Sequence, residues 1–205
     1  MKIDKIILHH AGGLGTNNLA STQNLTVKNI DLAHRDRWPD FKSSLGYFVG
    51  YTFVIEKDGT LTQTRAIGEE TAHTIGQNTS SVGIMIMGNF EKGVNIPTIE
   101  QKMRLKSLLN NLLTNQPLNV HVVPGTILDM SPSRIYPHRH FAQTSCYGSS
   151  LSDIWFKDMV SMQTNEVESV ESLVQKIMAL FAQLVALISK PKLGSHSSSC
   201  DAGRG

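Results

Sequence analysis

The chain has 205 residues, of which 40% are hydrophobic and 18% are charged, and its formal net charge is +2. This composition is typical of one globular domain with an appendage, and the small net charge gives no basis for a nucleic-acid partner. Two cysteines exclude a disulfide framework. The longest apolar run, residues 177–188, is too short to span a bilayer, so we expect no transmembrane segment. No apolar signal core precedes the first strand-like run, which predicts synthesis in the cytoplasm without a signal peptide.

The first elements read as strand, loop and helix. Residues 5–8 form an apolar run that is typical of a buried strand. Residues 11–24 are rich in Gly, Asn, Ser and Thr, which predicts a loop. Thr26 is a suitable N-cap for a helix that runs to about Arg37, where a Trp-Pro pair ends it.

The middle of the chain alternates strand and helix signals. Residues 51–55 and 61–65 flank a Lys-Asp-Gly-Thr turn, which predicts a β-hairpin. Residues 82–87 are short, apolar and glycine-bounded, as expected of a central strand. Residues 98–101 match a capping box, and we expect a helix behind it. Its leucines recur at helical spacing: Leu105, Leu108, Leu109, Leu112 and Leu113.

The next segment completes the globular part. Residues 120–123 are a further strand candidate, residues 124–137 read as a long loop with three prolines, and residues 154–160 favour a last helix. Strands that alternate with helices predict the α/β class, as a sandwich around one mostly central sheet. We therefore expect a globular domain over residues 1–163.

The composition changes near residue 166, and a separate C-terminal amphipathic helix is predicted over residues 164–190. Its apolar residues alternate at spacings of three and four: Val170, Leu173, Ile177, Leu180, Leu184 and Leu187, widened by Val174, Phe181 and Ile188. Three roles are open for this helix: docking on the domain, self-association, and insertion into a membrane surface. Acidic residues offset the basic ones, which weakens the membrane alternative, and the spacing follows a helical-bundle seam. We expect a homo-oligomer through this helix, and a disordered tail over residues 191–205.

Two histidine clusters raise the question of a metal. His9 and His10 end the first strand, and His138 and His140 precede Cys146 by a few residues. A catalytic zinc site needs three protein ligands and one open position, and neutral imidazole and thiolate suit zinc. A histidine at a strand end is also common as a structural residue, and a lone cysteine as packing. On spacing alone, both interpretations stay open.

Four motifs in a fixed order decide between them. "IILHHAGG", "GYTFVIEKDGTLTQTR", "TAHTIGQNTSSVGIMIMGNF" and "HRHFAQTSC" together resemble the zinc-dependent N-acetylmuramoyl-L-alanine amidases, a family shared by phage lysozyme-like amidases and peptidoglycan recognition proteins. The resemblance covers residues 5–157. It implies a mixed central sheet flanked by helices and a zinc amidase domain, in agreement with the elements above.

The resemblance implies a ligand set for the zinc. The first histidine after the apolar strand is His9, which leaves His10 as its neighbour on the other face. The second ligand lies eight residues before the cysteine, which selects His138 and not His140, and Cys146 is the third. His140 stands where the family usually has an acid.

The resemblance also implies catalytic and substrate-binding residues. Tyr51, in "GYTF", matches the catalytic tyrosine of the family, whereas Tyr47 lacks the following context. Thr144 stands where phage lysozyme-like members carry a catalytic lysine and recognition proteins commonly carry threonine. His73 and Asn78, in "TAHTIGQN", match positions near the substrate groove, and a structural role for either competes with binding.

The activity implied is hydrolysis of the amide between the lactyl group of N-acetylmuramic acid and L-alanine, with bacterial peptidoglycan as the partner. A phage or prophage endolysin that acts on the cell wall after release from the host cytoplasm is favoured. A cytosolic amidase that recycles anhydro-muropeptides is the alternative enzyme. A non-catalytic recognition protein is the alternative binding module, and members of that kind lack the zinc cysteine, which is present here as Cys146.

Overall fold

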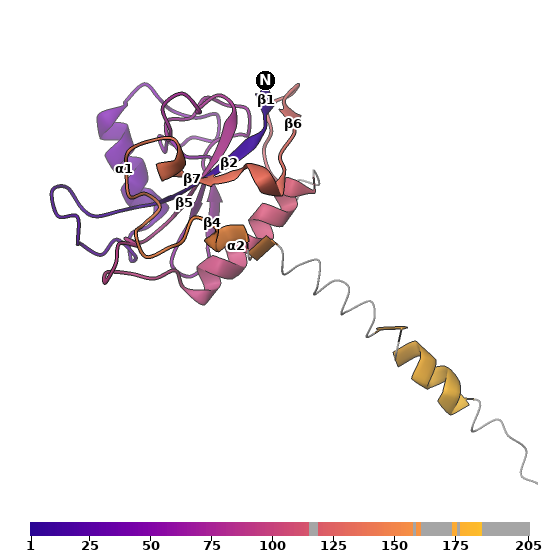
Figure 1. Cartoon of the computed structure of the whole chain (residues 1–205). Coiled ribbons are helices and arrows are strands. Elements are labelled where there is room, and N and C mark those ends of the chain that lie inside the picture. The colour runs from indigo at the N-terminus through magenta and orange to yellow at the C-terminus, as the bar shows by residue number, and fades with distance from the viewer. Residues whose placement is uncertain (115–118, 158, 161–173, 176, 186–205) are drawn as a thin grey trace, which may run out of the picture. The chain divides into compact units, whose positions relative to one another are not determined.

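The computed structural model of the chain describes residues 1–114, 119–157, 159–160, 174–175 and 177–185. The chain divides into two compact units, Met1–Met162 and Gln163–Gly205. The first unit carries the sheet and the two longer helices (Figure 1). It also carries every residue for which the sequence predicts a metal-binding, catalytic or substrate-binding role.

A five-stranded sheet forms the centre of the first unit. Its order is β4-β3-β5-β2-β7, with the β3–β4 pair antiparallel and the other pairs parallel. The strands are β2 (Lys5–His10), β3 (Phe53–Ile55), β4 (Leu61–Gln63), β5 (Ser81–Ile86) and β7 (Ile135–Pro137). A smaller parallel pair joins β1 (Lys2–Ile3) and β6 (Ile127–Leu128).

Helices cover both faces of the sheet (Figure 1). One face packs with α2 (Ile99–Leu113) in a cluster that includes Ile6 and Leu8 of β2. The other face packs with α1 (Val27–Arg37) through Val54 and Met85. Because both faces are covered, β2 is apolar at successive positions, as buried strands in layered α/β folds are. The predicted α/β class, with a mixed central sheet flanked by helices, is confirmed.

Both helices begin at the capping residues that the sequence predicts. Thr98 Oγ1 accepts a hydrogen bond from the Gln101 amide at 3.1 Å, and Gln101 Oε1 accepts one from the Thr98 amide at 3.0 Å. This reciprocal pair is a capping box, which satisfies two amides at the end of α2. The amide of Thr26 likewise donates to Asn29 Oδ1 at 2.9 Å at the start of α1.

Two predictions for residues 120–137 are wrong. Residues 120–123 form no strand and contribute only the isolated bridge between Val122 and Ile67. The predicted loop over residues 124–137 contains β6, a 3-10 helix (Pro132–Arg134) and the edge strand β7. An edge strand tolerates proline because one of its sides needs no backbone donors, so the prolines did not exclude pairing there.

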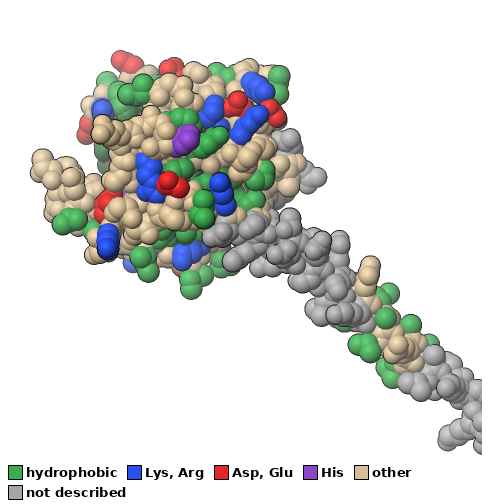
Figure 2. Space-filling view, in the orientation of Figure 1, with side chains coloured by type: hydrophobic (Ala, Val, Ile, Leu, Met, Phe, Trp, Pro, Cys, Tyr) green, Lys and Arg blue, Asp and Glu red, His purple; other side chains and the backbone are tan. Residues whose placement is uncertain are grey.

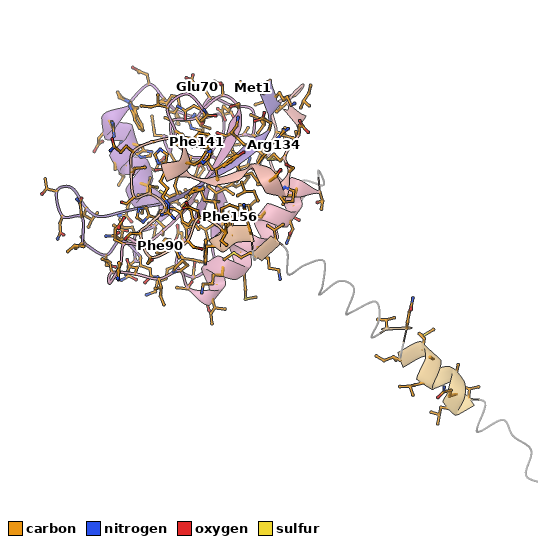
Figure 3. The ribbon with its side chains drawn as sticks, in the orientation of Figure 1. Met1, Glu70, Phe90, Arg134, Phe141 and Phe156 are labelled. Carbon is orange, nitrogen blue, oxygen red and sulfur yellow. The ribbon has the colours of Figure 1, made fainter. Side chains whose placement is uncertain are left out.

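The end of the first unit agrees with the predicted last helix. Residues 155–157 and 159–160 are helical. Phe156 is 1% exposed and belongs to the same core cluster as Phe90 (both labelled in Figure 3). Burial of this aromatic side chain fastens the last helical residues to the α2 side of the sheet.

The described part of the second unit is helical at residues 174–175 and 177–185. Its large apolar side chains are 49–67% exposed: Val174, Ile177, Met178, Leu180, Phe181, Leu184 and Val185 (Figure 2). The rest of the predicted seam, and the predicted tail over residues 191–205, lie outside the described residues. Among the residues that are described, no helix is long and apolar enough to cross a membrane.

Candidate metal and active site

The site begins at the carboxyl end of β2, where His9 and His10 point to opposite faces of the sheet. His9 is 1% and His10 7% exposed. His10 Nδ1 accepts a hydrogen bond from the Phe90 amide at 3.0 Å, and burial lowers its pKa to about 4. His10 is therefore neutral and bonded to the backbone, on the opposite face of the strand from His9.

Parallel pairing of β7 with β2 brings the second histidine to the first. Pro137 lies opposite Leu8 in the register, so His138 follows next to His9, and their ring centroids are 4.6 Å apart. The loop that follows brings Cys146 back to His9, and Cys146 Sγ lies 3.7 Å from His9 Nδ1. One donor atom each from His9, His138 and Cys146 lie within 4.8 Å of one another.

These three donors fit a zinc ion in chemistry, and the pair formed by His9 and Cys146 also fits it in spacing. Tetrahedral zinc binds nitrogen and sulfur at about 2.0–2.3 Å, which places neighbouring donor atoms roughly 3.5 Å apart. The separation of 3.7 Å between Cys146 Sγ and His9 Nδ1 matches this requirement. His140, by contrast, is exposed and stacks on Tyr136 with ring centroids 4.7 Å apart.

The protonation states of the three donors depend on their burial. Burial, followed by the neighbouring His73 and His138, holds the pKa of His9 well below its ordinary value. Burial also lowers the pKa of His138, so both imidazoles keep a free lone pair at neutral pH. Burial raises the pKa of the Cys146 thiol to about 12, and a coordinated cation would reverse this by stabilising the thiolate.

Arg139 fastens the loop that carries Cys146. Its backbone amide donates to the Cys146 carbonyl at 2.8 Å, and its guanidinium donates to the carbonyls of Gly148 at 2.8 Å and Leu151 at 2.6 Å. It also pairs with Asp153 at 2.5 Å. No local pattern predicts a role for this arginine, and its position next to His138 in the chain is the available signal.

Tyr51 lies just before β3 and beside the donor cluster. Its ring meets that of His9 edge-on at 5.0 Å between centroids, and stacks with that of His34 at 5.9 Å. Burial, and then Cys146, raise the pKa of Tyr51 above its ordinary value, so its hydroxyl remains protonated and able to donate. Tyr47 packs against the apolar cluster that contains Met87.

Thr144 lies on the exposed loop before Cys146. Its Oγ1 accepts a hydrogen bond from the Cys146 amide at 3.2 Å, which leaves the hydroxyl proton free to donate to a ligand. A cavity of about 590 Å³ is lined by Thr144 and Ser145, together with His10 and Glu91. The cavity is therefore lined by His10 and Ser145, which are the chain neighbours of the donors His9 and Cys146.

His73 and Asn78 both make hydrogen bonds within the protein. His73 is 8% exposed, and its Nδ1 lies 3.0 Å from His9 Nε2. Asn78 Oδ1 accepts hydrogen bonds from the amides of His73 at 2.9 Å and Thr74 at 2.8 Å. These contacts give both residues a structural role, and their predicted contact with substrate stays a prediction.

Comparison with known proteins places the chain in a family. Residues 1–149 match the model of the family described as N-acetylmuramoyl-L-alanine amidase. Peptidoglycan-recognition protein SC2 of Drosophila simulans is 30% identical over 149 residues, which are 71% of this chain and 68% of that protein.

Solved structures share the fold. N-acetylmuramoyl-L-alanine amidase LysC from Clostridium intestinale superposes with a TM-score of 0.55 at 24% identity, covering 79% of this chain and 85% of that one. Bumblebee PGRP-SA gives 0.53 at 23% identity, covering 76% and 80%. Together with the His-His-Cys cluster, the match over residues 1–149 shows that this chain belongs to the N-acetylmuramoyl-L-alanine amidase family, to which peptidoglycan recognition proteins are related.

Proposed function

We propose that this chain hydrolyses the amide between the lactyl group of N-acetylmuramic acid and L-alanine in bacterial peptidoglycan. His9, His138 and Cys146 would hold the zinc ion. The observation that carries the proposal is the convergence of two imidazoles and one thiol within 4.8 Å, at the end of a buried strand and beside Tyr51. Three protein donors of this kind are typical of a catalytic zinc site, which keeps one position open.

An amide is a poor electrophile and water a poor nucleophile, and a bound zinc ion addresses both by polarising the carbonyl and acidifying water. The protein's own groups stabilise the charge that develops. The protonated hydroxyl of Tyr51 donates a hydrogen bond to the developing oxyanion, and the Thr144 hydroxyl serves as a second donor. His9 and His138 stay neutral, so neither adds a positive charge that would repel the cation.

Recognition of peptidoglycan without cleavage is the competing function, since the relative above is named a peptidoglycan-recognition protein. The intact donor set favours the enzyme, because a binding-only role has no need for a thiol directed at two neutral histidines. Purified peptidoglycan separates the two. We expect the full chain to release new L-alanine amino termini without new reducing sugar ends, as detected by mass spectrometry, and to contain one zinc per chain. Peptidoglycan binding without new amino termini would establish the recognition role instead.

We propose further that the natural substrate is the intact wall, reached after release from the producing cell as endolysins do. The "GYTF…EKDGT" region and the separate C-terminal segment support this context over cytosolic recycling. Intact sacculi and soluble anhydro-muropeptides should be compared at equal concentrations of cleavable bonds. Faster cleavage of the small muropeptides than of sacculi would favour the recycling enzyme.

The C-terminal segment is proposed to join copies of this chain. Its described residues expose apolar side chains along the three-four spacing, and burying them against identical helices would remove that surface from water. We expect light scattering to report an oligomer for the full chain and a monomer for a truncation that ends at Gln163. A monomer in both would contradict self-association, and leakage of liposomes caused only by the full chain would identify a membrane-binding segment.

A further inference from the structure

His73 occupies a position that the proposed reaction does not use directly. It lies before β5, it is buried, and its ring touches one of the three candidate ligands on the side away from Cys146. We propose that His73 is a positioning residue, which accepts a hydrogen bond from His9 Nε2–H and thereby keeps His9 Nδ1 free to ligate. This inference rests on the proposed zinc site.

The direction of the hydrogen bonds follows from the two sides of the His9 ring. Its Nδ1 faces Cys146 Sγ at 3.7 Å, and its Nε2 faces His73 Nδ1 at 3.0 Å. A neutral imidazole carries one proton, and a nitrogen that carries it has no lone pair for a metal. The ligating nitrogen is therefore Nδ1, and the proton is on Nε2 and donated to His73. Thr74 Oγ1, 3.4 Å from the same Nε2, offers a second and weaker acceptor.

The other ring nitrogen of His73 then acts as a hydrogen-bond donor, as Nε2 of His9 does. Once its Nδ1 accepts, its own proton must lie on Nε2, which is 3.3 Å from Ser81 Oγ. The Ser81 hydroxyl in turn donates to the Gln77 carbonyl at 2.7 Å. The Thr74 hydroxyl also lies 3.0 Å from His73 Nδ1 and can donate to the same lone pair, so both neighbours of this nitrogen require it to be the acceptor. The opposite arrangement would direct an N–H of His9 at the ligand position and leave it unable to bind a cation.

The chemistry of this partner differs from the carboxylate that often supports a metal-bound histidine. His73 is an imidazole whose Nδ1 meets His9 Nε2 at 3.0 Å, and it can accept there only in its neutral form, because the cation has no lone pair. Because the partner is neutral, it cancels none of the positive charge of a bound divalent ion. The supporting residue thus orients His9 without reducing the electrophilic character of the site.

The fold holds His73 in place from two sides. Asn78 Oδ1 accepts the amides of residues 73 and 74, which shapes the turn before β5. Gly83 lies under the ring, where a Cβ would approach His73 Cδ2 to 2.5 Å. The motif "TAHTIGQN" and the glycine of "SVGIMI" therefore serve the same purpose, which is the placement of one imidazole behind His9.

The test uses the full chain and two substitutions that differ in one property. His73→Asn retains an acceptor near the position of Nδ1, whereas His73→Leu fills the space without one. We expect His73→Leu to weaken zinc binding by about 10–100-fold, the scale for losing a supporting hydrogen bond, in competition with a chelator. His73→Asn should recover most of the affinity. The exposed His121, changed to Leu, is the matched control and should bind zinc as the wild type does.

Two further readouts keep the positioning role separate from folding and from activity. Proton–nitrogen correlation spectra of the imidazoles, recorded with and without zinc, should show His9 and His73 of the wild type protonated at Nε2. Thermal unfolding in chelator identifies any variant that merely fails to fold. A proton on His9 Nδ1, or equal loss of zinc affinity in His73→Asn and His73→Leu, would overturn the inference. Wild-type zinc binding with the expected tautomers, but no peptidoglycan cleavage, would refute the amidase proposal alone.

Discussion

Replacing Cys146 by serine is expected to leave a folded protein that retains no zinc after dialysis and shows no hydrolysis above background. The substitution exchanges one atom in a half-buried side chain, so packing should barely change. A serine hydroxyl is far less acidic than a thiol and is not a zinc ligand of choice, so the cluster is reduced to two imidazoles. Elemental analysis, thermal unfolding and release of L-alanine amino termini measure the three outcomes.

The chain provides a matched control for this substitution. Cys200 is its only other cysteine, and Cys200→Ser should leave zinc content and hydrolysis unchanged. Stoichiometric zinc together with full activity in Cys146→Ser would show that the ligand assignment is wrong.

Replacing Tyr51 by phenylalanine is expected to lower the rate of hydrolysis by roughly a hundredfold or more, the scale for losing one oxyanion donor. The ring contacts with His9 and His34 do not involve the hydroxyl, so stability and zinc content should change little. The loss should appear in kcat, because the hydrogen bond forms with charge that exists only in the transition state.

Tyr47→Phe is the control for this second prediction. Tyr47 lies four residues earlier and packs against the apolar cluster beside α1, so removal of its hydroxyl should leave kcat unchanged. Equal losses in the two variants would mean that the hydroxyl of Tyr51 has no special role. Full loss of zinc in Tyr51→Phe would point to a disturbed metal site instead.

The local sequence determined the regular elements with strong signals. The apolar run at residues 5–8, the Lys-Asp-Gly-Thr turn and the capping box at Thr98 each depend on neighbours within a few positions, and the structure places β2, the β3–β4 hairpin and α2 there. The motifs that identify His9, His138 and Cys146 are short and local as well, and the fold brings these three residues together. Their roles as ligands remain predictions.

The tertiary structure decided what depends on pairing between distant segments. β7 has three residues and ends in a proline. It is a strand only because it pairs with the hydrogen-bonding edge of β2 that β5 leaves open. For His73 the family resemblance implies a place near the substrate groove, with a structural role as the alternative. Only the fold shows that residues 9 and 73 hydrogen-bond across 64 positions of chain. Local patterns record the preferences of neighbours, whereas the direction in which a buried imidazole donates its proton is set by atoms that folding alone brings within reach.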